Sequence, residues 1–247
     1  MKKSYSHARR AATMFAAACA LVVAASAQSA QDDWTQKPYN QWTMKEVEQI
    51  LSDSPWAQTR GKGIDPGVSV SDFPLGMSVD SEDITLRLRS ALPVRQAFAR
   101  LRQLKAKYDA QSDKAKASID EKTKVLLECP ACADNYVVTL SPAPGRDKGV
   151  PSALRQMSLA ELKLNVTLTD ERGTKRELVH FVPQKSQGDE ATFFFERYDE
   201  KGAPLFTPSS KKVVIQFAPK IFGGRGTTIT KFEFDVTKML VAGQVAF

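Results

Sequence analysis

The sequence predicts an α+β protein with a short N-terminal helix, one long helix and a C-terminal antiparallel β-sandwich-like region. Two stretches place apolar residues at helical spacing, the first at residues 44–51 and the second from residue 94 onward. After about residue 122, short alternating runs of apolar and polar residues are separated by turn residues, a pattern typical of sandwiches and barrels. We therefore expect an α/β unit over residues 81–247, whose β-rich part spans about 122–247.

Residues 1–30 have the layout of a secretory signal peptide. A basic start is followed by an apolar core from Ala11 to Ala25 and by small residues that favour cleavage after Ala27 or Ala30. One alternative is a retained membrane anchor, but the core is shorter than the roughly 20 residues of a spanning helix. A second alternative is lipidation of Cys19, which lacks the large apolar residue expected three positions earlier. We expect an exported chain, periplasmic or extracellular, with no transmembrane segment after cleavage.

Much of the positive charge belongs to this segment. It carries four Lys or Arg and no acidic residue, so its removal lowers the formal net charge from +7 to +3. The excess that remains does not indicate a nucleic-acid-binding protein.

Residues 31–60 form a Trp-rich leader, which contains all three tryptophans. Thr43 and Glu46 have the spacing of a capping box, and Ser54-Pro55 should end the helix that follows. If exposed, Trp34, Tyr39 and Trp56 would suit recognition of a sugar or peptide. The alternative is that the helix folds back and buries its indoles. Residues 61–80 are rich in Gly, Pro, Ser and Asp and predict a loop or linker.

The next two elements carry most of the remaining basic residues. Residues 84–89 alternate and predict a strand with one wet, basic face. From Pro93 to about Lys116 the spacing predicts the longest helix, with a local charge of +5. Arg95, Arg102 and Lys105 are its candidate contacts with an anionic surface or an acidic envelope component. The alternative is an ordinary solvated helix face.

Period-two alternation governs the rest of the chain. Residues 161–168 predict one strand, and a turn at 170–173 returns the chain along 176–182 as a hairpin. Further strands are expected at 192–198, 213–217 and 229–236.

Cys129-Pro130-Ala131-Cys132 lies between two apolar runs, which we interpret as strands joined by a tight turn. In an exported protein, two cysteines with no others to pair with indicate a disulfide with each other. Redox-active thiols and half of a metal site are the alternatives. A thiol enzyme needs a helix after the first cysteine, whereas a β-branched run follows here.

The sequence contains no catalytic motif that we can assign. It has neither the Gly-x-Ser-x-Gly turn of a hydrolase nor a phosphate-binding Gly-rich loop before a helix. A zinc site would need two ligands beyond the cysteines, and only His180 and scattered carboxylates remain. We expect no catalytic residue, no metal and no cofactor.

Trp42 and Ser54-Pro55-Trp56-Ala57, behind a signal peptide, resemble the leader of a group of secreted bacterial proteins of unknown function. The resemblance covers Tyr39 to Thr59 and implies export only. The β-rich half is similar to immunoglobulin-like sandwiches in pattern alone. The sequence thus favours a non-catalytic binding or structural protein of the cell envelope. A periplasmic thiol–disulfide enzyme using Cys129 and Cys132 is the alternative.

Overall fold

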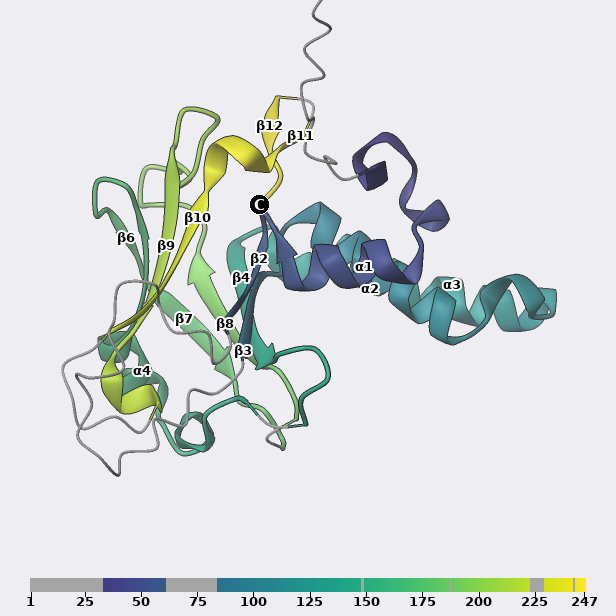
Figure 1. The fold of residues 1–247 in the computed structure, drawn as a ribbon. Helices are drawn as coiled ribbons and strands as arrows, with labels where there is room; N and C mark the ends of the chain where they lie inside the picture. The colour runs from purple at the N-terminus through teal and green to yellow at the C-terminus, as the bar shows by residue number, and fades with distance from the viewer. Residues whose placement is uncertain (1–32, 61–83, 148, 187, 223–228, 242) are drawn as a thin grey trace, which may run out of the picture. The chain divides into compact units, whose positions relative to one another are not determined.

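The computed structural model describes residues 33–60, 84–147, 149–186, 188–222, 229–241 and 243–247. The compact unit runs from Trp34 to Phe247. The predicted signal peptide, Cys19 and the predicted loop at 61–80 lie outside the described residues. In the described part, helices and strands are mixed and every strand pair is antiparallel, in agreement with the coarse fold class (Figure 1).

The leader supplies both a helix and strands. Two short 3-10 helices, Asp33–Gln36 and Tyr39–Gln41, precede α1 (Met44–Ser52). Thr43 and Glu46 cap α1 reciprocally, so two of its free backbone donors are satisfied. The chain then forms β1 (Asp53–Ser54) and β2 (Ala57–Arg60), which open a six-stranded sheet with the order β1-β2-β3-β4-β8-β7. The leader is therefore built into the main fold.

The strand β3 (Ile84–Leu88) lies inside that sheet, between β2 and β4 (Asn135–Pro142). All five of its residues are buried, so the prediction of a wet, basic face was wrong. Leu86 and Leu88 join the hydrophobic core on one side. On the other side, Arg87 donates from Nε to the carbonyl of Leu51, the last turn of α1, and from Nη1 to Ser141 Oγ. Alternation identified the two faces, but helices cover the one expected to be wet.

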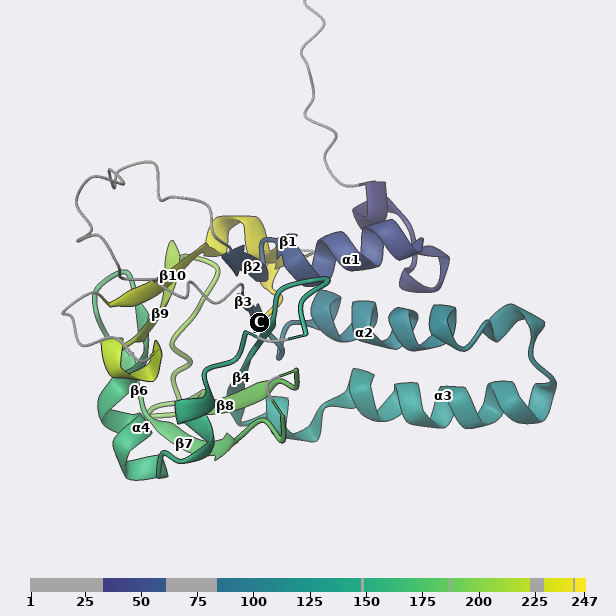
Figure 2. The same ribbon diagram turned by 60° about the horizontal axis from the view of Figure 1, so that its bottom comes forward.

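The predicted long helix is two helices. α2 (Leu92–Lys105) ends where Lys107 adopts a left-handed conformation with φ 50°. The chain reverses through the 3-10 turn Tyr108–Ala110, and Ser112 caps α3 (Asp113–Glu128). Figure 2 shows α2 and α3 as an antiparallel hairpin with α1 beside α2, in agreement with their contacts. The run Val125-Leu126-Leu127, expected in a strand, therefore lies in the last turns of α3.

The remaining strands divide between two sheets. β8 (Ala191–Glu196) and β7 (Leu178–Val182) complete the first sheet. The second has the order β10-β9-β5-β6, formed by Thr230–Asp235, Lys212–Phe217, Val166–Asp170 and Lys175–Arg176. Phe193 of β8 meets Phe217 of β9 with ring centroids 5.6 Å apart, so the sheets share one core. The short strands β11 (Leu240–Val241) and β12 (Gln244–Val245) pair with each other. The strands predicted at 192–198, 213–217 and 229–236 are confirmed with small shifts of their ends.

Two predictions in this region were wrong. The run 161–168 is not one strand, because Ser158 and Glu161 form a capping box that starts α4 (Leu159–Asn165) before β5 begins. The hairpin return is also shorter than predicted. β5 pairs with β6 on one side and with β9 on the other. After β6 the chain crosses to the edge of the larger sheet as β7, with a bulge between Leu178 and His180.

Candidate functional site

The three leader tryptophans form an aromatic cluster inside the protein. Trp34 lies 5.5 Å from Trp42 and 5.9 Å from Trp56, edge to face in both pairs. Trp34 is 6% exposed and Trp56 is 3% exposed, so the exposure that their candidate binding role required is absent. Trp42 donates from Nε1 to the carbonyl of Trp34. Tyr39 is partly buried against Trp42. This tryptophan cluster is core and not a recognition surface.

Cys129 and Cys132 are joined by a disulfide, with Cα atoms 5.3 Å apart. The prediction that the bond closes a turn between two strands was wrong, because α3 precedes it and β4 follows it. Cys129 is the C-cap of α3 and has a left-handed backbone with φ 41°. A helix C-terminus carries partial negative charge and so disfavours a neighbouring thiolate. The placement suits a structural link between α3 and β4.

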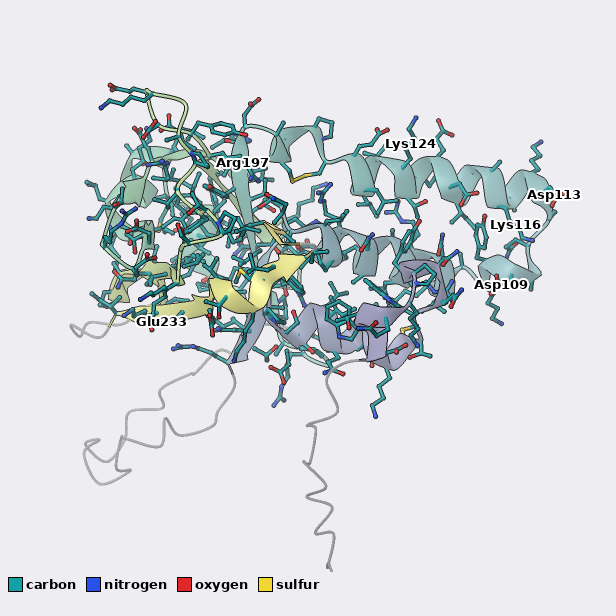
Figure 3. The ribbon with its side chains drawn as sticks, turned by 90° about the horizontal axis from the view of Figure 1, so that it is seen from above. Asp109, Asp113, Lys116, Lys124, Arg197 and Glu233 are labelled. Carbon is teal, nitrogen blue, oxygen red and sulfur yellow. A yellow bond between two sulfur atoms is a disulfide. The ribbon has the colours of Figure 1, made fainter. Side chains whose placement is uncertain are left out.

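The candidate arginines on α2 hold the helical hairpin together. Arg95 donates from Nη1 to the carbonyl of Leu127, and Arg102 donates from Nη1 to that of Lys122, at 3.0 Å. Both acceptors lie on α3. Leu127 is in its last turn, where carbonyls lack intrahelical partners, whereas Lys122 lies further inside the helix. Further out, Asp109, Asp113 and Lys116 lie at the far end of the hairpin, and Lys124 lies on α3 nearer the sheets (Figure 3). Arg102 and Lys105 remain at the surface.

Arg89 follows β3 and is one of several arginines with a buried guanidinium nitrogen that has no hydrogen-bond partner among the described residues, the others being Arg95, Arg176 and Arg197. The guanidinium carbon of Arg89 lies 3.6 Å from the ring centroid of Phe98 on α2. Its Nη1 is buried and makes no hydrogen bond to any of the described residues. Burial lowers the pKa of Arg89, Glu190 acts in the opposite direction, and Arg102 lowers the pKa further. The neighbouring cation Arg87 has its pKa lowered by burial as well. The region therefore holds positive charge that its own carboxylate offsets only in part.

Arg89 and Phe98 open onto a groove of about 540 Å³ between α2, α3 and the start of β8. We call it the arginine groove. Its lining residues are Arg89, Phe98, Leu101, Arg102, Lys105, Ala106, Leu126 and Glu190. Three cations face one carboxylate, so the lining carries a formal charge of +2, and its other residues are apolar. Cations beside an apolar wall form a binding surface for an anion that also has an apolar part.

A second hollow of about 750 Å³ lies between α4, β6, the start of β7 and the turn after β8. Its lining contains four cations and four carboxylates. Several of these groups already have partners: Lys163 pairs with Glu177, and Arg176 lies 4.0 Å from Asp199. Arg176 Nε is buried without a hydrogen-bond partner among the described residues, but the charges of this lining balance one another, so the hollow has no net charge that would attract an ion.

The sequence pointed to part of the arginine groove. Arg102 and Lys105 were candidates, and Phe98, Leu101, Arg102 and Lys105 have the spacing of one helix face. Arg89 falls in the alternating pattern of residues 84–89, whose basic face the sequence predicts to be solvated. No sequence pattern marks Glu190 or Leu126 as a groove residue, because only the packing of β8 and α3 brings them to α2. Of the leader residues proposed as contacts, none lines the groove.

Within the described residues, no group of three or more His, Cys, Asp or Glu is close enough to hold a metal ion. None of the helices in the same part of the chain has the length and apolar character needed to cross a membrane. Comparison of the chain with protein families, with curated proteins and with solved structures finds no match.

Proposed function

We propose that this chain is an exported, non-catalytic binding protein, periplasmic or extracellular, that holds an anionic ligand in the arginine groove. The observation that carries the proposal is the combination, at Arg89, of a buried Nη1 without a hydrogen-bond partner in the described part of the chain and a place in a groove whose lining has a formal charge of +2. Export rests on the signal-peptide layout of residues 1–30. In this proposal, the two antiparallel sheets form a sandwich-like scaffold that supports the helical hairpin.

The electrostatics support an anion as the ligand. Taking a cation out of water is costly unless a counter-charge or hydrogen bonds compensate for it. Glu190 compensates in part, while Arg102 and Arg95 add to the positive field at Arg89. An anion in the groove would reduce this repulsion and would bind in a region of lowered dielectric, where charges interact more strongly than in water.

The size and make-up of the groove agree with this role. Small-molecule sites commonly occupy about 300–1,000 Å³ and combine apolar walls with a few polar groups. A thiol–disulfide enzyme, the other candidate class, receives less support, because Cys129 lies at the C-terminal end of α3.

A binding measurement tests the proposal directly. Titration of the purified protein with methyl phosphate, followed through the arginine Nε–H signals in NMR spectra, should shift the Arg89 signal to saturation. Arg89→Gln should weaken binding at least tenfold, since a charge-assisted hydrogen bond contributes about 1.5–3 kcal/mol. Lys105→Gln at the rim should weaken it about two- to fivefold, in line with the small contribution of an exposed charge.

Lys114→Gln is the matched control. It also removes one positive charge, but Lys114 lies on α3 and does not line the groove. Thermal unfolding of each variant establishes that it is folded. Equal affinity of the wild type, Arg89→Gln and Lys105→Gln would overturn the proposed site.

A further inference from the structure

The arginine groove has two chemically different sides, and a ligand must satisfy both. The charged side consists of Arg89, Arg102 and Lys105 with Glu190. The apolar side is formed by Phe98 and Leu101 on α2 and by Leu126 on α3. Phe98 and Leu101 pack against the hydrophobic core while remaining partly accessible, so their exposed surface belongs to the groove. A small inorganic anion would leave this apolar surface in water.

From these two sides we propose that the ligand is a phosphate monoester of an apolar alcohol. This inference rests on the proposed function. A phosphate monoester carries about −1.5 to −2 charges at neutral pH, which matches the formal +2 of the groove lining. A monocarboxylate would leave one cation unpaired. The apolar alcohol part would cover Leu101 and Leu126.

The arrangement along α2 gives the ligand a direction. Arg89 stacks on Phe98, and Arg102 lies one turn further on the same helix face. The phosphate therefore binds near Arg89 and Arg102, which both line the groove and are close enough for Arg102 to act electrostatically on Arg89. Arginine is well suited to this position because its planar fork matches the oxygens of a phosphate. The apolar chain then runs between Leu101 and Leu126, from facing helices, with Lys105 at the rim.

The test compares methyl, octyl and dodecyl phosphate as monomers, by isothermal titration calorimetry. Affinity should rise at least tenfold from methyl to octyl phosphate, because burial of each methylene group is favourable. Dodecyl maltoside, which is neutral, should bind at least tenfold more weakly than dodecyl phosphate. A farnesyl phosphate titration beside dodecyl phosphate distinguishes an isoprenoid from a straight chain, and tighter binding of either one supports the proposal.

Two variants test where the apolar part of the ligand binds. Leu126→Ser should reduce the affinity for octyl phosphate at least threefold and leave that for methyl phosphate unchanged. Val125→Ser is the matched control, since Val125 is the adjacent residue, is 64% exposed and does not line the groove. It should leave both affinities unchanged.

The outcomes separate this inference from the proposed function. If methyl and octyl phosphate bind equally and Arg89→Gln weakens both, the anion site stands and the amphiphilic ligand is wrong. If no phosphate binds, both are wrong. Binding to vesicles that contain anionic lipid, with no binding of monomeric octyl phosphate, would overturn the inference in favour of a membrane surface.

Discussion

The tryptophan cluster and the arginine groove lie on neighbouring elements, yet they treat their conspicuous residues in opposite ways. Trp34, Trp42 and Trp56 are large apolar side chains that pack against one another and join the hydrophobic core. Arg89 is a cation whose burial its surroundings compensate only in part. Trp34 and Trp56 also have a buried Nε1 without a hydrogen-bond partner among the described residues, but that donor is neutral and the burial of the large indole ring stabilises the fold. Burial of a poorly compensated cation costs more free energy than burial of a neutral donor. A residue buried at a cost is the better guide to function.

The largest effect is expected in the tryptophan cluster. Trp42→Ala should lower the free energy of unfolding by about 3–5 kcal/mol, because it leaves a cavity and removes the hydrogen bond to Trp34. Chemical denaturation measures this loss. Tyr198→Ala, at a site that is 45% exposed, is the control and should cost much less. A loss below about 1 kcal/mol for Trp42→Ala would show that the cluster is not core.

The two arginines at β3 sharpen the comparison. Arg87→Met should lower the free energy of unfolding by about 1.5–3 kcal/mol, because Arg87 donates charge-assisted hydrogen bonds to Leu51 and Ser141. Arg89→Met should change it by less than about 1 kcal/mol, since methionine keeps the apolar contact with Phe98 and removes a costly charge. Urea unfolding of both variants tests the difference. Equal losses would mean that Arg89 is as structural as Arg87.

The disulfide should have an intermediate effect on stability. Replacing both Cys129 and Cys132 by Ser should lower the free energy of unfolding by about 2 kcal/mol, because the bond closes a short loop. The same variant should weaken binding in the groove, since Leu126 lies on the helix that the bond ties to β4. Unfolding curves and phosphate titrations measure the two effects. If the variant is fully folded and binds phosphate as tightly as the wild type, the disulfide does not help to position the groove.

The smallest effect concerns the cap of α1 beside the tryptophan cluster. A hydrogen bond and ion pair with Lys37, at 2.6 Å, help lower the pKa of Glu46 from 4.5 to about 2. Because the folded-state pKa is depressed, the stabilisation is present above pH 4.5 and is lost as the pH falls toward 2. Lys37→Met should raise the pKa of Glu46, measured by carbon-13 NMR of its carboxyl group. Lys45→Met is the control, and an equal shift in both variants would contradict the pairing.

Helix starts and strand positions are local features, and several of them follow from the amino-acid pattern alone. The Thr43–Glu46 capping box starts α1, and period-two alternation placed β8, β9 and β10, because caps and pleats depend on residues a few positions apart. Two other local signals, the N-caps of α3 and α4, were not used in the prediction. The capping box at Ser158 starts α4 where alternation had suggested a strand, and α3 begins at the cap of Ser112 after the reversal at Lys107.

Which face of a strand is exposed to water depends on how the layers of the fold pack. Alternation assigned Arg87 to the side of β3 opposite Leu86, but whether water or a helix covers that side depends on where the chain places α1 and α2. The arginine groove follows the same rule, because Arg89 follows β3, Leu126 lies on α3 and Glu190 precedes β8, so they meet only after the sheet and hairpin have formed. Burial is a property of the assembled layers, and a charge becomes unusual only once its neighbours have excluded water.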